Sequence, residues 1–350
     1  MLKKLHLKDF TLFEATDLEF GRHLNVFVGE NGAGKTHILK AAYCGLKVSA
    51  ELHHGGMAGK AQWQVAMANK LSGVFRPDEL GRLVRRGRSR SKAELAYSFD
   101  RPAFDFSFAI SRLAKDEVTS IVEPQGHLEK SPVYVPTREL LTLSPWFIAL
   151  YKTSYVPFEE TWYDTCLLLE APLARGPREA TIKRLLVPLE EAMGGELELN
   201  KTGFYLHLPN GTMEMHVVAE GLRKLAMVAR LIATGFLLED GCLFWDEPET
   251  NLNPRILKRV ARTILSLARS GVQVFVATHS LFLVRELQIL GSETEFGDLE
   301  NRYFGLQLQD GGVRVSQGAT MDDVGDLAAL DEELLQSDRY LDTQLVSNGS

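Results

Sequence analysis

Apolar and polar residues alternate through the first thirty positions of the chain, in short runs that end at a glycine-rich segment. The runs LKKLHLKDF, DLEF and LNVFV have the two-residue period of β-strands. The last run passes directly into GENGAGKT, residues 29–36, and a helical pattern begins near Lys35. The pattern therefore predicts a strand, a glycine-rich turn and a helix in direct succession.

The pattern changes between residues 57 and 194. A helical stretch becomes increasingly basic, and AELAYSFD and AFDFSFAI then alternate as an antiparallel pair of strands would. We interpret residues 57–130 as an inserted basic lobe. A buried strand at Val133–Val135 resumes the core, and a helical, aromatic-rich subregion follows at about 138–194.

The remaining part of the chain alternates strands and helices around two hairpin turns. Asn-Gly at 210–211 and Asp-Gly at 310–311 are strong signals for such turns. A helix opens at Gly221, the apolar run CLFW ends at Asp246, and another helical pattern covers 254–269. These elements predict an α/β fold with a mixed sheet.

The length of the chain predicts one large domain with an inserted lobe, or two domains. At 350 residues it is larger than one hydrophobic core usually supports. We assign the core to residues 1–56 and 131–320, around the inserted lobe. Residues 321–350 form an acidic C-terminal tail.

Composition limits the classes of partner. The 39 Lys and Arg against 46 Asp and Glu give a net charge of −7, which excludes a chain basic throughout that binds nucleic acid by bulk attraction. The three cysteines have no metal-ligand spacing and fit a reducing compartment. No apolar run has the length of a secretion signal or a membrane span, so we expect a cytoplasmic protein without a membrane partner.

The glycine-rich segment matches the pattern G-x-x-x-x-G-K-[ST] at every fixed position. Its glycines let the backbone curl so that successive N–H groups point at phosphates. Lys35 would reach the β- and γ-phosphates, and the hydroxyl of Thr36 would bind Mg²⁺. The expected cofactors are ATP and Mg²⁺, and the expected nucleotide-binding residues are Gly29, Glu30, Asn31, Gly32, Ala33, Gly34, Lys35 and Thr36.

Two later segments supply carboxylates and a histidine. Asp246 ends a buried strand and would join the Mg²⁺ shell with Thr36, and Glu247 beside it would deprotonate the attacking water. His279 lies 33 residues after Asp246, at the tip of the next predicted strand, where it would bind the γ-phosphate or the lytic water. The alternatives are two acids that only end a strand and a histidine that is structural.

Together, GENGAGKT, WDEPETNLNP and VATHS resemble the ABC-type ATPase heads of the SMC, RecF and overcoming-lysogenisation-defect proteins. The resemblance implies a P-loop NTPase fold of the ABC-ATPase head type. It also implies a head-to-tail homodimer, in which ATP on one P-loop is closed by a signature loop of the other head. The matching loop is Val218–Lys224, where Gly221 would meet the γ-phosphate. Ala219 replaces the signature serine of the family, and Arg223 would offer charge instead.

Two further segments resemble functional loops of the family, but each also has a simple structural interpretation. Asn251-Leu252-Asn253 resembles the loop that crosses the dimer interface, and Asn253 before Pro254 is also typical of a helix start. Arg138 lies where the family has a sensing loop. It would contact nucleotide or the partner head, or form a surface ion pair.

The inserted lobe contains a local excess of positive charge. Between Lys60 and Arg101, ten Lys or Arg face four Asp or Glu. Such a segment suits phosphate contacts with nucleic acid, but a solvated face or a dock for the acidic tail gives the same pattern. The candidate nucleic-acid contacts are Arg82, Arg85, Arg86, Arg88 and Arg90.

These features favour an ATP-hydrolysing dimer that couples its ATP state to DNA or to a separate effector protein, in anti-phage defence or DNA repair. No long heptad repeat is present, and only 71 residues follow His279, so we expect a head without coiled coil or nuclease domain. A transporter ATPase subunit is the alternative, disfavoured by the lack of an LSGGQ signature and by the 185 positions from Thr36 to Gly221. A structural module that binds ATP without turnover would not need Glu247.

Overall fold

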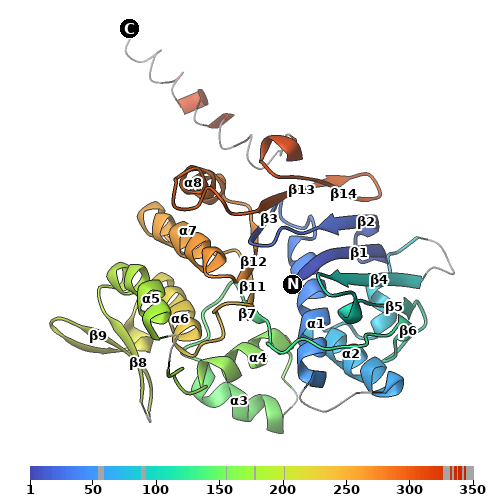
Figure 1. The fold of residues 1–350 in the computed structure, drawn as a ribbon, viewed down its shortest axis with the longest axis horizontal. Helices are drawn as coiled ribbons and strands as arrows, with labels where there is room; N and C mark the ends of the chain where they lie inside the picture. Colours follow the sequence, from blue (N-terminus) through green and yellow to red (C-terminus); the bar gives the residue numbers. More distant parts are fainter. Residues whose placement is uncertain are drawn as a thin grey trace.

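The computed structural model describes most of the chain, and Figure 1 shows its arrangement. The predictions for Arg88, for Arg90 and for most of the acidic tail lie outside the described residues. The described residues are 1–53, 59–87, 92–154, 156–176, 179–200, 202–325, 332, 335, 336, 338–340 and 343.

A six-stranded sheet forms the centre of the molecule (Figure 1). Its five neighbouring strands from β13 to β7 are parallel, and β14 pairs antiparallel with β13 at one edge. Parallel strands end at the same edge of a sheet, so the loops after β3, β11 and β12 meet there. In spatial order the strands are β14 (Gly312–Gly318), β13 (Asn301–Gln309), β3 (Leu24–Gly29), β12 (Gln273–Thr278), β11 (Cys242–Asp246) and β7 (Val133–Val135).

The two faces of this sheet bury different side chains. On one face, Phe27, Phe244 and Phe275 pack in the same apolar cluster as helix α1 (Lys35–His53). On the other face, valine and tryptophan side chains pack against three helices. The continuous apolar runs of the sequence therefore produce strands buried on both sides, as is typical of parallel sheets. The three helices are α6 (Glu220–Ala233), α7 (Pro254–Arg269) and α8 (Leu281–Gly291).

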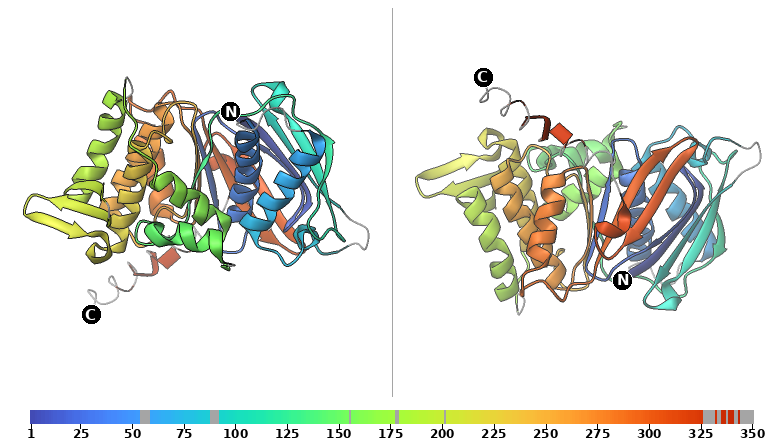
Figure 2. Two further views of the ribbon diagram at one scale, coloured as in Figure 1. Left: turned by 90° about the horizontal axis from the view of Figure 1, so that it is seen from below. Right: turned by 90° about the horizontal axis from the view of Figure 1, so that it is seen from above.

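A second, antiparallel sheet lies on the far side of α1 and corrects the predicted domain organisation (Figure 2). β4 pairs with β1 from Leu2 opposite Phe99 to Lys8 opposite Glu94. The strands of the inserted lobe therefore share a sheet with β1 and β2, so the sheet is not confined to residues 57–130, and β4 gives β1 hydrogen-bond partners along its second edge. In spatial order the strands are β2 (Phe13–Glu19), β1 (Leu2–Phe10), β4 (Lys92–Phe99), β5 (Phe106–Ser111) and β6 (Thr119–Val122).

The predicted helical subregion and both hairpins are present. A small sheet follows the subregion and turns at Asn210, and β13 turns into β14 at Asp310-Gly311. None of the described helices is both long and apolar enough to span a membrane. The remaining elements are α2 (Lys60–Phe75), α3 (Ser144–Thr153), α4 (Glu160–Leu169), α5 (Glu179–Met193), β8 (Glu196–Asn200), β9 (Gly203–Leu208) and β10 (Gly211–Glu214), with 3-10 turns at Leu80–Leu83, Pro102–Phe104, Met215–Val217 and Asp322–Val324.

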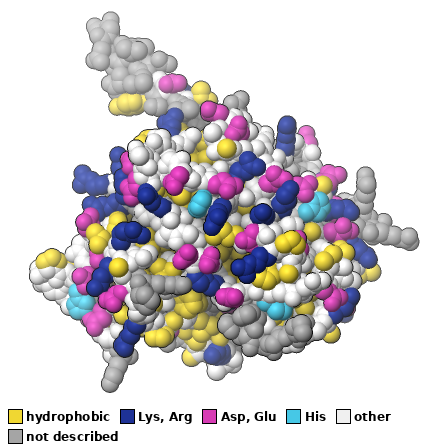
Figure 3. All heavy atoms as spheres, viewed as in Figure 1, with side chains coloured by type: hydrophobic (Ala, Val, Ile, Leu, Met, Phe, Trp, Pro, Cys, Tyr) yellow, Lys and Arg dark blue, Asp and Glu magenta, His cyan; other side chains and the backbone are white. Residues whose placement is uncertain are grey.

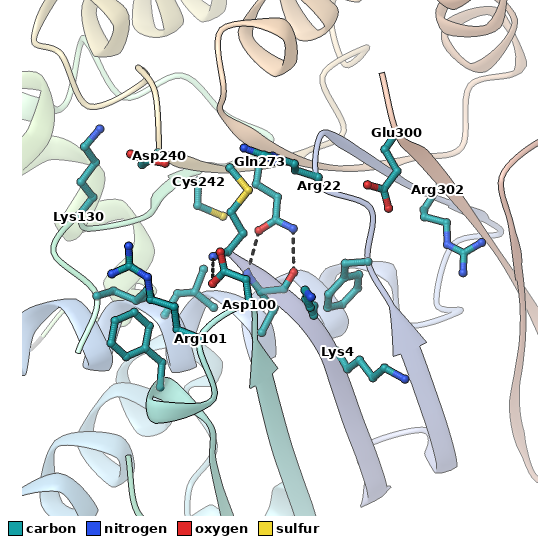
Figure 4. A pocket seen from close by; sticks show the side chains of 18 of the residues that line it. Lys4, Arg22, Asp100, Arg101, Lys130, Asp240, Cys242, Gln273, Glu300 and Arg302 are labelled. Carbon is teal, nitrogen blue, oxygen red and sulfur yellow. Dashed lines mark hydrogen bonds and ion pairs between the residues drawn. The ribbon is translucent and has the colours of Figure 1, made fainter. Parts of the chain in front are cut away.

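A cleft of about 730 Å³ opens at the opposite edge of the central sheet, where β11 and β12 begin (Figure 4). The amide of Gln273 lies at its floor and hydrogen-bonds both the N–H and the carbonyl of Leu2, at 3.1 and 2.8 Å. These bonds join the two sheets. Charged side chains of both signs surround the cleft, with Lys130 and Arg101 on one side and Glu300 on the other.

Candidate functional site

The glycine-rich turn between β3 and α1 has the backbone that its sequence requires. Gly32 and Gly34 have φ angles of +83° and +91°, which L side chains rarely adopt. At Gly32 an added Cβ would meet no atom within 4 Å, so the turn is open on that side. Glu30 and Asn31 are also exposed. Residues 29–36 thus form an accessible loop that leads into the N-terminus of a 19-residue helix.

The side chain of Lys35 folds back across this loop. Its Nζ donates to the carbonyls of Gly29 and Glu30, at 2.7 and 3.0 Å. Lys35 is only 5% exposed, and burial lowers the pKa of its ammonium group. An anionic phosphate would be a stronger partner for this ammonium than two neutral carbonyls, so the loop is prepared to bind one.

Thr36 and Asp246 meet across the carboxyl edge of the sheet. The Thr36 hydroxyl donates to the Asp246 carboxylate, with distances of 3.1 and 3.0 Å to its two oxygens. The Tyr134 hydroxyl donates to the same carboxylate at 3.3 Å. Burial raises the pKa of Asp246 to about 6. The oxygen donors of Thr36 and Asp246 are those that Mg²⁺ prefers. Tyr134 was not among the predicted residues, because the run VYV shows only a buried strand.

Glu247 and His279 lie side by side beyond Asp246. Glu247 has a φ of +47°, unusual for a residue with a side chain, and its N–H donates to the Ala277 carbonyl at 2.8 Å. Oε1 of Glu247 lies 3.0 Å from Nδ1 of His279. The sequence therefore identified two side chains that the fold brings into hydrogen-bond contact, although 32 positions separate them.

Glu249 is a further carboxylate of this cluster that sequence reasoning missed. Its Oε1 accepts from the Thr278 hydroxyl at 2.6 Å and from the His279 N–H at 3.1 Å. Its side chain is 8% exposed. Glu249 therefore fixes the backbone that carries His279. The segment DEPE contains the signal, since Glu249 lies two positions after Glu247, but only the fold shows which way it turns.

The predicted signature loop packs against its own chain. An added Cβ at Gly221 would lie 2.6 Å from the Asn251 carbonyl, so the backbones of α6 and of residues 247–252 are in close contact. Arg223 forms an ion pair with the buried Glu139 at 3.2 Å and is not extended into solvent. Ala219 is exposed at the N-cap of α6 and gives no side-chain cap.

Asn253 lies in the loop before α7, and Arg138 lies in the predicted sensing loop after β7. Asn253 caps α7, because its side chain accepts from the Ile256 N–H at 3.1 Å. Asn251, two residues earlier, has a φ of +64°. Arg138 follows β7 and its side chain is exposed. The helix-start interpretation of Asn253 is thus confirmed, and the roles of Asn251 and Arg138 at a dimer interface stay predictions.

Comparison with known proteins defines the family. A family model described as "AAA domain, putative AbiEii toxin, Type IV TA system" matches residues 24–285, and a second AAA-domain model matches residues 4–42. The first match covers most of the chain and includes every cluster described above. The chain belongs to this AAA family. Its fold is that of ABC-type ATPase heads, and its sequence is similar to RecF.

Relatives and solved structures agree with this assignment. The DNA replication and repair protein RecF of Actinobacillus pleuropneumoniae serotype 3 (strain JL03) is 24% identical over 352 residues, covering 84% of this chain and 96% of RecF. RecF of Streptococcus suis (strain 05ZYH33) is 48% identical over 42 residues, 12% of each chain. These two similarities relate the chain to RecF over most of its length and, more closely, over one short segment.

Two SMC head structures show the same fold. One is an SMC head bound to the C-winged helix domain of ScpA, with a TM-score of 0.51 and 16% identity over 92% of this chain and 98% of that one. The other is an SMC head with an extended coiled coil, bound to the C-terminal domain of ScpA and derived from Pyrococcus furiosus. It has a TM-score of 0.52 and 13% identity over 97% of this chain and 99% of that one. The expected ABC-type head fold is confirmed.

The structure describes three of the five arginines that are candidate nucleic-acid contacts, Arg82, Arg85 and Arg86. Arg85 donates to the Gly311 carbonyl and lies 3.4 Å from the Glu14 carboxylate. Its side chain is therefore bound between the β13–β14 turn and β2. Arg82 lies 3.6 Å from Asp78, and Arg86 is exposed. Figure 3 shows positive and negative side chains interspersed over the face in view. Of the three predicted arginines that the structure describes, Arg82 and Arg86 face solvent.

Proposed function

We propose that this AAA-family head binds ATP at residues 29–36 and hydrolyses it to ADP and phosphate, with Glu247 as the general base. The observation that carries the proposal is the contact between Glu247 and His279 beside the Thr36–Asp246 pair. One oxygen of Glu247 is engaged by the histidine, so the other can accept the proton of an attacking water. His279 orients this carboxylate and is itself positioned by Glu249.

Thr36 and Asp246 would hold Mg²⁺, since a hydroxyl and a carboxylate already lie together there. When bound, the ion neutralises charge on the β- and γ-phosphates. Lys35 would exchange its two loop carbonyls for phosphate oxygens, and the backbone N–H groups of the open turn would bind the rest. Asp246 must be ionised for this role, which its raised pKa allows at neutral pH.

The test of this function is ATP turnover by Glu247→Gln. The amide keeps the size of the side chain but cannot accept the proton, so kcat should fall by roughly a hundredfold while ATP affinity is retained. Glu300→Gln is the matched control, because Glu300 is exposed at the opposite edge of the sheet and should leave kcat unchanged. Wild-type turnover by Glu247→Gln would show that another group is the base.

We propose further that two heads close over ATP head to tail, with the N-terminus of α6 facing the nucleotide of the partner. The support is the ABC-type head fold, together with the exposed Ala219 at the start of α6. Gly221 and Arg223 would approach the γ-phosphate in this arrangement. Because Gly221 is in close contact with Asn251 of its own chain, a substitution there would disturb both heads at once.

Ala219→Asp is a cleaner probe of the dimer. Aspartate is a favourable N-cap, so α6 should remain folded, while its charge would repel the partner's γ-phosphate. We expect Ala219→Asp and Lys35→Ala each to lose turnover when alone, and a mixture of the two to recover part of it. Ala219→Ser is the control and should stay active. Full activity of Ala219→Asp alone would contradict closure in trans.

The head would couple its ATP state to DNA or to a separate effector protein. RecF, the relative matched over most of this chain, is named as a DNA replication and repair protein. The family description mentions a toxin of a type IV toxin–antitoxin system, which fits a role in defence. Changing the exposed Arg82 and Arg86 together to Ala should weaken salt-sensitive DNA binding and leave turnover unchanged. Unaltered DNA binding would place the contact elsewhere.

A further inference from the structure

A buried lysine lies directly behind the proposed base. Lys224, on α6, is 0% exposed, and its Nζ donates to the carbonyls of Glu247 and Thr250, at 3.1 and 3.2 Å. It forms no ion pair with any carboxylate of the described residues. Burial lowers its pKa to about 8. A cation without a carboxylate partner in the protein interior is costly, so its position calls for a reason beyond packing.

The two carbonyls belong to a tightly wound loop. The Glu247 carbonyl also accepts from the Thr250 N–H at 3.2 Å and from the Thr250 hydroxyl at 3.0 Å. Glu247 and Asn251 both have positive φ angles, of +47° and +64°. Such conformations persist only where the surroundings fix them. Among the described residues, Lys224 supplies the one charged donor to the Glu247 carbonyl.

We infer that Lys224 is a positioning residue for ATP hydrolysis, which fixes the carbonyl of Glu247 and thereby the direction of its carboxylate toward His279. The direction of the Glu247 side chain depends on its φ and ψ angles, and the ammonium group opposes rotation of the peptide that follows. This inference rests on the proposed role of Glu247 as the base. In the described structure the hydrogen bonds of Lys224 go to Glu247 and Thr250 and not to residues 29–36, so its effect should fall on turnover and not on ATP affinity.

The geometry also links Lys224 to the start of its helix. Gly221, one turn earlier on α6, packs against Asn251 and Leu252 of the same loop. A displacement of the N-terminus of α6 would therefore move the lysine and the loop together. In this way, contact at Ala219 or Gly221 would reach Glu247 of the same head.

The experiment compares Lys224→Met and Lys224→Arg with the wild-type protein. Methionine fills the same space without charge, and replacing a buried charge by an apolar side chain is often neutral or stabilising. We expect Lys224→Met to lower kcat at least tenfold, to change the Kd for ATP less than twofold and to keep or raise the Tm. Lys224→Arg keeps a charged donor and should recover part of kcat. The control is Lys258→Met, an exposed lysine on α7, which should match the wild type.

The outcomes separate this inference from the proposed function. Wild-type kcat in Lys224→Met, with an inactive Glu247→Gln, would overturn the role of Lys224 alone. A fall in kcat that is accompanied by a fall in Tm, without recovery in Lys224→Arg, would make Lys224 a structural residue and also overturn it. Wild-type kcat in Glu247→Gln would overturn both proposals.

Discussion

The two edges of the central sheet differ in the buried charges and the backbone strain that they contain. At the carboxyl edge, Lys35, Asp246 and Lys224 are buried. Burial lowers the pKa of both lysines and raises the pKa of Asp246, so it favours the neutral form of each side chain. Glu247 there has a φ of +47°. These features cost stability, and they concentrate where the strands β3, β11 and β12 end.

The amino edge of the same strands is built from neutral hydrogen bonds and surface ion pairs. Gln273 joins the two sheets through its amide, with bonds to Leu2 and to the carbonyl of Gly21. Some of the charged groups around the cleft form surface ion pairs, as Lys4 does with Glu19. One edge of the sheet thus concentrates buried charges and strained backbone, as our proposed ATP site would require. The other edge consists of contacts that hold the two sheets together.

The largest effect should come from Lys35→Ala. Removal of the ammonium group from a loop built for a polyanion should weaken ATP binding by at least about a hundredfold. Lys4→Ala at the opposite edge is the matched control and should bind ATP as the wild type does. Isothermal titration calorimetry measures both. Equal affinity in Lys35→Ala and Lys4→Ala would remove the distinction between the two edges.

Asp246→Asn should reveal the stability cost of the carboxyl edge. Burial raises the pKa of Asp246 from an ordinary value of 3.8 to about 6, so the ionised carboxylate destabilises the folded state. Its contribution to stability is then lost as pH rises from about 4 through 6, since the folded state binds the proton more tightly than the unfolded state. A shift of this size corresponds to about 3 kcal/mol at pH 7.

Denaturant unfolding without Mg²⁺ or nucleotide checks this prediction. Asp246→Asn should be more stable than the wild type at pH 7, and the difference should shrink toward pH 4. Glu300→Gln provides a comparison whose stability difference should not follow this pH course. If the difference in stability between Asp246→Asn and the wild type did not change with pH, burial of the ionised Asp246 would not destabilise the folded state.

A smaller effect on turnover is expected from His279→Ala. His279 contacts Glu247 through one ring nitrogen and does not itself accept the water proton in this account. Its loss should lower kcat by about tenfold, less than the loss of Glu247. The rate of phosphate release at saturating ATP gives kcat for His279→Ala and for Glu247→Gln, each relative to the wild type. A larger loss in His279→Ala than in Glu247→Gln would exchange the roles of the two residues.

The smallest effect on turnover should come from Gln273→Leu at the amino edge. This change removes the hydrogen bonds of Gln273 to buried backbone groups of Leu2 and Gly21 and should reduce the free energy of unfolding by about 2 kcal/mol or more. The kcat per folded molecule should stay at the wild-type value. A fall in kcat under conditions where the variant is fully folded would show that the amino edge takes part in the ATP cycle.

The parts of this site that could be predicted are local in sequence. The run from β3 to α1 contains the whole glycine-rich loop within eight residues, and Asp246 and Glu247 stand together at the end of one strand. The alternating pattern of β1 and of β4 likewise predicted strands. It could not predict that Lys8 pairs with Glu94, because periodicity shows which face is buried and not which strand lies alongside. For this reason the predicted bounds of the inserted lobe, 57–130, left out β1 and β2, which share its sheet.

The residues that sequence reasoning missed act through burial and through long-range contacts. Glu249 and Lys224 resemble ordinary charged positions until the fold encloses them. Arg85 belongs to a basic segment by composition, but the turn between β13 and β14 brings the Gly311 carbonyl to it. In each case the partner lies far away along the chain or is a backbone group, and neither leaves a pattern in the sequence.

We propose that the carboxyl edge of the sheet hydrolyses ATP with Glu247 as the base. The most direct measurement is the chemical identity of the nucleotide after ATP is incubated with purified protein and Mg²⁺ and the bound fraction is recovered. The wild-type protein should return ADP, and Glu247→Gln should return intact ATP in similar amount. Intact ATP from the wild type, or ADP formed equally fast by Glu247→Gln, would contradict the account.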